Sequence, residues 1–192
     1  MDSDYDSHYK RALKLIQEYA YEREEYEDRD VLERIIIPYL LSKINPKKIL
    51  DVRREDYQKF YNLFFKGREL WTIDKNPKRK KYGSENHITD DVVNIKNYFS
   101  ENSFDLIIMN GVFGWGLNKP EDVEKTILSF YKILRKGGIF VFGWNDIPDL
   151  KPLELENIES LKKFKPYFFE PLKTISFKSL TEEHTYSFFI KE

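Results

Sequence analysis

The sequence predicts an α/β fold: a mostly parallel sheet of seven strands with an antiparallel C-terminal hairpin, helices on both faces and an N-terminal helical extension. Strand-like and helix-like segments alternate through the middle of the chain, which is typical of βαβ units. The runs FDLIIM and IFVFG are almost wholly apolar, as strands covered on both faces are. Two further strand-like segments near the C-terminus are joined by Thr181-Glu182-Glu183, and so short a connection permits only an antiparallel pair.

The N-terminal part is expected to be helical. Residues 4–28 carry apolar side chains at helical spacing, which predicts one helix with a single buried stripe. Asp30 and Glu33 have the spacing of a capping box, which predicts a second helix running to about Ile44, where an Asn-Pro pair ends it. Pro38 is expected to kink this helix. We expect one domain over residues 1–192, with these helices in 1–45 and the α/β core in 46–192.

The α/β core is expected to begin at Lys48. Strands are predicted at Lys48–Val52, Glu69–Asp74, His87–Asp90, Phe104–Asn110 and Ile139–Trp144. Helices are predicted at Asp56–Phe65, after the turn Asn76-Pro77, at Val92–Ser100, at Asn118–Leu134 with Asn118 as its cap, and near Leu153–Phe164. The terminal hairpin is predicted at Lys173–Leu180 and His184–Lys191.

Composition restricts the function. The chain of 192 residues has a net charge of −1, so no overall field draws it to nucleic acid or to a membrane surface. It contains no cysteine, which excludes disulfides, thiolate metal sites and a cysteine nucleophile, and which fits a cytoplasmic protein. No metal cluster, nucleophile elbow or Walker-type loop is present, and no apolar run is long enough to cross a bilayer. We expect neither a metal ion nor a nucleic-acid partner.

Acidic and amide side chains recur where the predicted strands end. In an open α/β sheet, ligands bind beyond the carboxyl ends of the strands, at the point where the strand order reverses. A single aspartate at such a position is usually a helix cap, so the series is more informative than any one member. Its members are Asp51, Asp74, Asp90, Asp91, Asn110, Asn145 and Asp146.

From about Ile44 to the C-terminus the sequence resembles the class I S-adenosylmethionine-dependent methyltransferases, a family with a Rossmann-like fold. KKILDV is similar to the family's first strand, LWTID to its second and HITDD to its third. FDLIIMNGVFGWGLN is similar to the fourth strand and its loop, and ILRKGGIFVFG to the double-glycine turn and fifth strand. The resemblance implies S-adenosyl-L-methionine as cofactor.

The resemblance also implies roles for individual residues. Asp74 would accept hydrogen bonds from both ribose hydroxyls. Asp90 would contact the adenine amine, with Asp91 as the alternative. Asp51 would lie near the methionine ammonium group, and the backbone at Asn110 and Gly111 would approach the same end of the cofactor.

The acceptor side is expected on the loops after the fourth and fifth strands. Val112 to Trp115 would line the cleft beside the methyl group, with Phe113 and Trp115 as an apolar wall; a tight turn with Trp115 packed into the core is the alternative. Trp144 and Asn145 would face the same cleft. A general base would be Asp146 or, in second place, His184, for which a partly exposed edge residue is the favoured alternative. No large insertion could grip a macromolecule, so a small-molecule acceptor is expected.

One motif departs from the family. Where its members have a glycine-rich loop after the first strand, this chain has Arg53-Arg54-Glu55-Asp56. A positive guanidinium 5 Å from a sulfonium would be unfavourable by about 3 kcal/mol at an effective dielectric near 20. Glu55 and Asp56 could offset this repulsion, and Arg53 could instead bind the cofactor's carboxylate.

Two other functions therefore stay open from the sequence. One is a non-catalytic binding or scaffold protein that has lost the cofactor. The other is an enzyme that uses the cleft for another nucleotide, with Arg53 and Arg54 receiving phosphate. The basic run at residues 75–81 is expected to be a solvated face.

Overall fold

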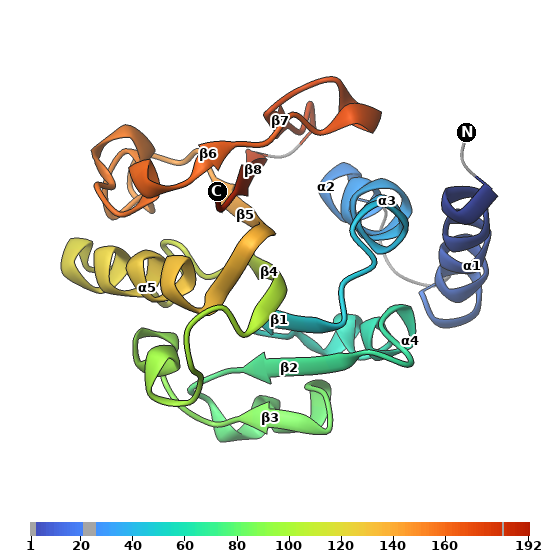
Figure 1. Ribbon diagram of the computed structural model, residues 1–192, viewed down its shortest axis with the longest axis horizontal. Coiled ribbons are helices and arrows are strands. Elements are labelled where there is room, and N and C mark those ends of the chain that lie inside the picture. Colours follow the sequence, from blue (N-terminus) through green and yellow to red (C-terminus); the bar gives the residue numbers. More distant parts are fainter. Residues whose placement is uncertain (1–2, 21–25, 182) are drawn as a thin grey trace.

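The computed structural model describes residues 3–20, 26–181 and 183–192. Its centre is a mixed sheet in the order β3-β2-β1-β4-β5-β8-β6, with β7 also paired to β8 (Figure 1). The parallel strands are β1 (Lys48–Val52), β2 (Glu69–Ile73), β3 (Asn86–Ile88), β4 (Phe104–Asn110) and β5 (Leu134–Asn145). The antiparallel strands are β6 (Lys165–Pro166), β7 (Ser176–Lys178) and β8 (His184–Ile190).

The predicted fold class is confirmed, with one strand more than expected. The additional strand is the two-residue β6, which pairs with the end of β8. The hairpin of β7 and β8 forms as predicted, although Glu182 of its turn lies outside the described residues. β8 runs antiparallel to β5 along its whole length, so the start of β8 lies beside the carboxyl end of β5.

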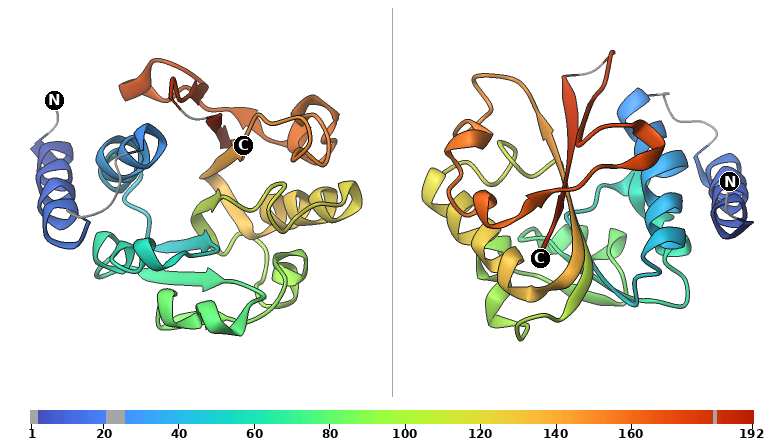
Figure 2. Two further views of the ribbon diagram at one scale, coloured as in Figure 1. Left: turned by 180° about the vertical axis from the view of Figure 1, so that it is seen from behind. Right: turned by 45° about the horizontal axis from the view of Figure 1, so that its top comes forward.

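Helices cover both faces of the sheet (Figure 2). One face packs against α5 (Pro120–Ile133) and η4 (Val92–Asn97), and the other against α3 (Ile37–Lys43) and α4 (Tyr61–Phe64), with α1 (Ser3–Tyr19) packed outside these helices. β4 is apolar almost throughout because both of its faces are buried. Leu106 and Ile108 point into one core and Ile107 and Met109 into the other, as the two-residue period of a strand requires.

The N-terminal helices differ from the expectation. α1 ends at Tyr19 instead of continuing to residue 28, and residues 21–25 lie outside the described residues. α2 (Glu27–Val31) has Tyr26 as its N-cap residue, so the capping box predicted from Asp30 and Glu33 is wrong. Glu33 is instead buried, and its carboxylate accepts a hydrogen bond of 2.5 Å from the Tyr61 hydroxyl.

The expected disturbance at Pro38 takes the form of a π-helical turn, η1 (Leu32–Ile36), between α2 and α3. Pro38 then occupies the first turn of α3, directly after this π-helical turn. α3 ends at Lys43, close to where the Asn-Pro pair predicts.

Several predicted helices are shorter than expected. The segment 56–65 forms η2 (Asp56–Gln58) and α4; 92–100 forms only η4; and 153–164 forms η5 (Leu155–Asn157) and η6 (Leu161–Lys163). The remaining short helices are η3 (Pro77–Tyr82) and η7 (Glu170–Leu172). Segments of this length are marginal as α-helices because nucleation fixes many dihedrals for few hydrogen bonds.

Asn118 does not cap α5. The N-cap residue is Lys119, without a side-chain hydrogen bond, and the Asn118 side chain accepts a hydrogen bond of 3.0 Å from the Gly116 amide. Asn118 therefore stabilises the loop after β4 instead of the helix.

The strand order reverses at β1, which pairs with β2 on one side and β4 on the other. Chain connections leave these neighbouring strands in opposite directions, and this opens a crevice at their carboxyl ends.

Candidate active site at the carboxyl edge of the sheet

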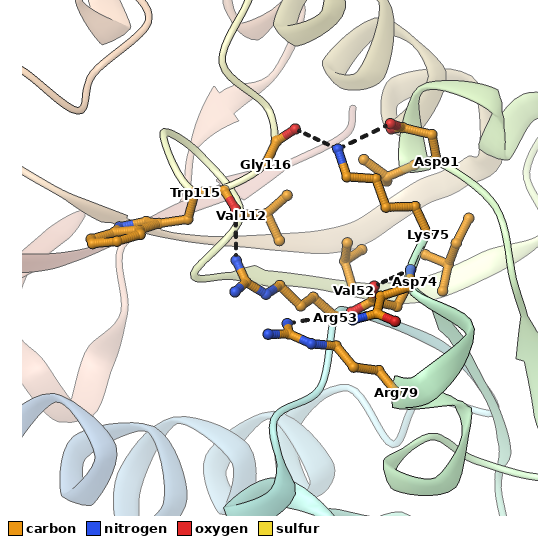
Figure 3. A pocket seen from close by; sticks show the side chains of 12 residues that line it. Val52, Arg53, Asp74, Lys75, Arg79, Asp91, Val112, Trp115 and Gly116 are labelled. Atoms are coloured by element: carbon orange, nitrogen blue, oxygen red, sulfur yellow. Dashed lines mark hydrogen bonds and ion pairs between the residues drawn. The ribbon is translucent and has the colours of Figure 1, made fainter.

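Two adjoining cavities lie at the carboxyl edge. The first, of about 210 Å³, lies beyond β1, β2 and the loop after β4, and its lining includes Asp74, Arg79 and Asp91 (Figure 3). The second, of about 330 Å³, is bounded by α2, η2 and the ends of β4, β5 and β8. Arg53 and Trp115 line both, so the two cavities form one cleft divided by these side chains. Taken together they fall within the size range of ligand sites, whereas the first alone is below it.

Asp74 directly follows β2 and points into the first cavity (Figure 3). Its Oδ1 accepts a hydrogen bond of 2.8 Å from the Asn76 amide, which fixes the carboxylate. Its Oδ2 is buried and receives no hydrogen bond from any residue that the structure describes; its ion-pair partner there is Arg79, with Nη1 at 3.6 Å. A buried carboxylate oxygen without a donor is costly, so this oxygen is suited to a ligand's hydroxyl groups.

The two candidates for an adenine contact are separated by the structure. Asp91 lines the first cavity, caps η4 through the Val93 amide at 3.2 Å and lies 3.5 Å from Lys75 Nζ. Asp90 accepts hydrogen bonds from the Tyr98 hydroxyl, the Asn94 amide group and the Asp91 backbone, which lower the pKa of its carboxyl group. Its carboxylate is thus used locally, and the geometry favours the alternative, Asp91.

Arg53 crosses the cleft from the end of β1 to the loop after β4. Its Nη1 donates to the carbonyl oxygens of Gly111 at 2.5 Å and Trp115 at 3.0 Å, and its Nη2 donates to Glu55 at 2.9 Å. Its φ of 61° lies in the left-handed region that glycine adopts most easily. The backbone therefore keeps a conformation suited to glycine while carrying a long cationic side chain.

Arg54 does not face the cleft. Its side chain is 1% exposed, donates to Asp51 at 2.6 Å and to the Gln58 carbonyl at 2.8 Å, and lies over the Tyr61 ring. Burial raises the pKa of the Asp51 carboxyl group in spite of this partner. Asp51 thus faces the protein interior, where it neutralises Arg54, and the expectation that it lies near a ligand's ammonium group receives no support from this geometry.

The second cavity has polar groups from three strands. Asn110 and Gly111 come from the end of β4, Asn145 from β5 and His184 from β8. His184 is 4% exposed, so the alternative of an exposed edge residue is wrong. Its Nδ1 lies 3.2 Å from Asn145 Oδ1, and because an amide oxygen can only accept, Nδ1 donates this hydrogen bond.

Gly143 makes room for this polar group. An ideal Cβ on Gly143 would lie 2.3 Å from Asn110 Oδ1 and 3.0 Å from His184 Nε2. Both atoms therefore lie close to one point over β5. Asn110 Oδ1 is buried without a hydrogen bond from the described residues, while its Nδ2 lies 3.4 Å from the Tyr186 hydroxyl.

The aromatic residues of the two loops divide between core and cleft. Phe113 is 2% exposed and packs edge-on against Phe142, so it does not form the expected wall. Trp115 is 52% exposed and lines both cavities, and its ring projects away from Asp74 in Figure 3. Trp144 packs beside the core and donates to the Ser187 hydroxyl at 3.2 Å instead of facing the cleft.

Asp146 is engaged outside the cavities. Lys151 at 2.8 Å and Lys178 at 3.3 Å donate to its two carboxylate oxygens. The hydrogen bond from Lys151 is the largest cause of a lowered pKa of the Asp146 carboxyl group. A carboxylate held between two ammonium groups is a poor base, so of the two base candidates the geometry favours His184.

Sequence reasoning missed two contributions to the cleft. Within the basic run, Lys78, Lys80 and Lys81 are exposed as expected. Arg79 instead turns into the first cavity, where its Nη1 lies 2.8 Å from a Glu55 carboxylate oxygen and 3.6 Å from Asp74 Oδ2. The second omission is Tyr26, Arg29 and Tyr57 in the second cavity. No local pattern marked them, because the first two lie far from the strand ends in sequence.

Neither a metal centre nor a membrane span is found within the described ranges. No group of three or more His, Asp or Glu residues there could hold a metal ion. No helix among them has the length and apolar character that crossing a bilayer requires.

Comparison with known proteins adds a family and a set of similar folds. The family described as "Methyltransferase domain" matches residues 58–142. Comparison with curated proteins gives no significant match.

Solved structures match over nearly the whole chain. The N-methyltransferase NodS from Bradyrhizobium japonicum WM9, in complex with S-adenosyl-L-homocysteine, is 17% identical with a TM-score of 0.64, and 99% of each chain is covered. A SAM-dependent methyltransferase from Archaeoglobus fulgidus is 16% identical with a TM-score of 0.61, covering 93% of this chain and 99% of that one. The 1,6-didemethyltoxoflavin-N1-methyltransferase of Burkholderia thailandensis is 14% identical with a TM-score of 0.55, covering 100% and 91%. At these identities the likeness establishes a shared fold.

Proposed function

We propose that this chain, whose residues 58–142 match the methyltransferase-domain family and whose fold is shared with S-adenosylmethionine-dependent methyltransferases, transfers a methyl group from S-adenosyl-L-methionine to a small-molecule acceptor. The cofactor would lie along the first cavity, with its methionine end at Arg53, and the acceptor would occupy the second cavity.

The observation that carries the proposal is the Asp74 carboxylate oxygen that receives no hydrogen bond from the described residues. A ribose presents two neighbouring hydroxyl groups, and a carboxylate can accept from both. Asp74 has one oxygen fixed by a backbone amide and the other buried without a donor, at the strand end where the crevice opens. Ile73, Val92 and Val112 supply apolar walls on which an adenine ring can pack, with Asp91 in reach of its amine.

The contacts of Arg53 favour a role in binding the cofactor's carboxylate over a role in obstructing the cofactor. Its guanidinium donates to two carbonyl oxygens, which are weaker acceptors than a carboxylate, so a ligand carboxylate can replace or join them. Glu55 at 2.9 Å already offsets the positive charge that a sulfonium would otherwise meet. Arg54, held by Asp51 in the interior, adds no charge to the cleft.

Positioning is expected to supply most of the rate. Bound S-adenosyl-L-methionine supplies an electrophilic methyl group, so the protein needs only to align the acceptor in line with it and exclude water. His184 would take the proton of an N–H or O–H acceptor through Nε2, while Asn145 holds its ring. A small acceptor is supported by the size of the second cavity and by the 1,6-didemethyltoxoflavin bound in the Burkholderia enzyme.

Thermal unfolding with S-adenosyl-L-homocysteine tests the cofactor. At about 100 times its dissociation constant, a ligand should add about 2.7 kcal/mol of stability. Asp74→Asn keeps the shape of the side chain but removes the charge, and we expect at least a tenfold loss of affinity. Asp149→Asn, at an exposed position, is the matched control and should bind like wild type.

Absence of any shift at millimolar ligand would contradict the proposal and favour a scaffold protein without cofactor. A shift with ATP but not with S-adenosyl-L-homocysteine would favour the use of another nucleotide. Unchanged affinity in Asp74→Asn would show that the ribose is placed wrongly.

A further inference from the structure

The second cavity contains an arginine stacked between two tyrosines. The Arg29 guanidinium carbon lies 4.3 Å from the ring centre of Tyr26 and 4.1 Å from that of Tyr57. All three residues line the cavity. Arg29 and Tyr26 come from the N-terminal segment and Tyr57 from η2, so the stack forms only when α2 folds against the edge of the sheet.

Stacking occupies the faces of the guanidinium and leaves its N–H groups. Within residues 3–20, 26–181 and 183–192, no carboxylate or carbonyl oxygen accepts a hydrogen bond from the Arg29 side chain. The neighbouring Arg53 and Arg79 both contact Glu55, and Arg54 contacts Asp51. Arg29 thus differs from the other arginines of the region in presenting its donors to the cavity.

This arrangement is suited to a planar anion. A guanidinium has five N–H donors in one plane, and a carboxylate accepts two of them side by side. The tyrosine rings restrict the guanidinium to one orientation, so little conformational entropy remains to be lost on binding. A dianionic phosphate fits less well because Asp28 and Glu55 line the same cavity and would repel it.

We propose that Arg29 binds a carboxylate of the methyl acceptor, so that the acceptor is a small organic acid. The inference rests on the proposed function for the identity of the second cavity as the acceptor site. The group to be methylated would be an N–H or O–H of the same molecule, because Asn110 Oδ1 supplies an acceptor for such a donor beside His184 in this cavity. A carboxylate at Arg29 would hold that group in register with them.

Benzoate and benzamide serve as matched probes, because they have the same shape and differ in charge. Calorimetric titration of the full chain saturated with S-adenosyl-L-homocysteine should show saturable benzoate binding at least tenfold tighter than benzamide binding. The Nε resonance of Arg29 in an arginine-labelled sample should shift on titration with benzoate. Arg29→Gln should abolish the preference, and Arg29→Lys, which keeps the charge without the paired donors, should retain part of it.

Arg34→Gln is the control, because Arg34 lies nearby but is paired with Asp30 at 3.0 Å. It should bind benzoate like wild type. Equal affinity for the two probes, no benzoate binding at tens of millimolar, or unchanged binding in Arg29→Gln would overturn the proposal. So would tighter binding of phenyl phosphate, or loss of benzoate binding when S-adenosyl-L-homocysteine is added, since the latter would assign Arg29 to the cofactor.

Failure of this proposal can be distinguished from failure of the proposed function. The stabilisation by S-adenosyl-L-homocysteine depends on Asp74 and should be the same in Arg29→Gln as in wild type. Benzoate binding to the protein without cofactor is measured separately. A protein that binds S-adenosyl-L-homocysteine but not benzoate would overturn only the carboxylate assignment.

Discussion

The two cavities share Arg53 and Trp115, yet they are built from different parts of the chain. The first is formed by the carboxyl ends of β1 and β2 with the segments that follow β1, β2, β3 and β4, all within residues 52–116. The second joins the ends of β4 and β5 to α2 from the N-terminus and to β8 from the C-terminus. The first therefore depends on the parallel sheet alone, while the second requires the whole chain to fold.

The charges of the two cavities differ as well. In the first, a buried carboxylate oxygen of Asp74 has no hydrogen-bond donor among the described residues and lies 3.6 Å from Arg79 Nη1. In the second, the Arg29 guanidinium faces the cavity, and the carboxylates of Asp28 and Glu55 form part of its walls. Glu55 connects the two, because it pairs with both Arg53 and Arg79, and Arg79 reaches Asp74. A ligand that moves Arg79 would leave Glu55 paired with Arg53 alone.

Arg53 lines the cleft, whereas Arg54 is part of the buried core. Replacing each of them is therefore expected to give the largest difference in the free energy of unfolding. Arg54→Met leaves Asp51 buried without its partner, which should lower the free energy of unfolding by about 3–5 kcal/mol. Arg53→Met, at a partly exposed position, should cost about 1 kcal/mol or less. Urea unfolding of both variants measures the difference.

The double variant Asp51→Asn with Arg54→Met is the control, since it removes both buried charges and should recover part of the lost stability. Equal destabilisation by Arg53→Met and Arg54→Met would show that the two arginines do not differ in this way.

Gly143→Ala sharpens the comparison by changing only the second cavity. The new Cβ would meet Asn110 Oδ1 at 2.3 Å, so either Asn110 or the strand must shift, at a cost of about 1–3 kcal/mol of stability. Binding of benzoate should be lost, whereas binding of adenosine, which needs the first cavity alone, should be kept. Loss of adenosine binding together with benzoate binding would mean that the two cavities do not act as separate sites.

Asp91→Asn tests the wall of the first cavity. Asparagine can still cap η4, so the variant removes the charge with little change to the backbone. Adenosine affinity measured by calorimetry should fall about tenfold, or 1.4 kcal/mol. Asp90→Asn is the matched neighbour, and because its carboxylate is bound to Tyr98 and Asn94 it should leave the affinity unchanged. The reverse result would assign the adenine contact to Asp90.

The same division between local and distant contributions explains which features were predictable from the sequence. The mostly parallel sheet follows from the alternation of strand-like and helix-like segments, and this fold is confirmed, whereas the role of Asp74 was implied by the family resemblance together with the rule that ligands bind beyond strand ends. Phe113 and Trp115 were assigned to one wall together because the sequence gives no sign of which side chain turns inward. Asp51 was assigned to the cleft by the family resemblance, and nothing in the sequence showed that it would pair with Arg54 in the interior.

Arg29 could not be predicted at all. Its position on α2 gives it ordinary surface character, and only the packing of α2 beside η2 places Tyr57 against it. His184 is a related case, because its burial follows from the pairing of β8 with β5. Contacts of this kind depend on tertiary structure and leave no periodic signal in one sequence.

Asp146→Asn should have the smallest effect and would separate the two base candidates. Because the lysine partners lower the pKa of the folded Asp146 carboxyl group, its stabilisation is present above the ordinary value near 3.9 and is lost as pH falls through the lower folded value. Wild type should therefore be more stable than Asp146→Asn at pH 7, by no more than about 1 kcal/mol at this partly exposed site, and the two melting curves should converge below pH 4. Binding of S-adenosyl-L-homocysteine and of benzoate should be unaffected at pH 7, because neither cavity includes this side chain among its described lining residues. Weaker binding in this variant would place Asp146 in the cleft after all and would remove the reason for preferring His184 as the base.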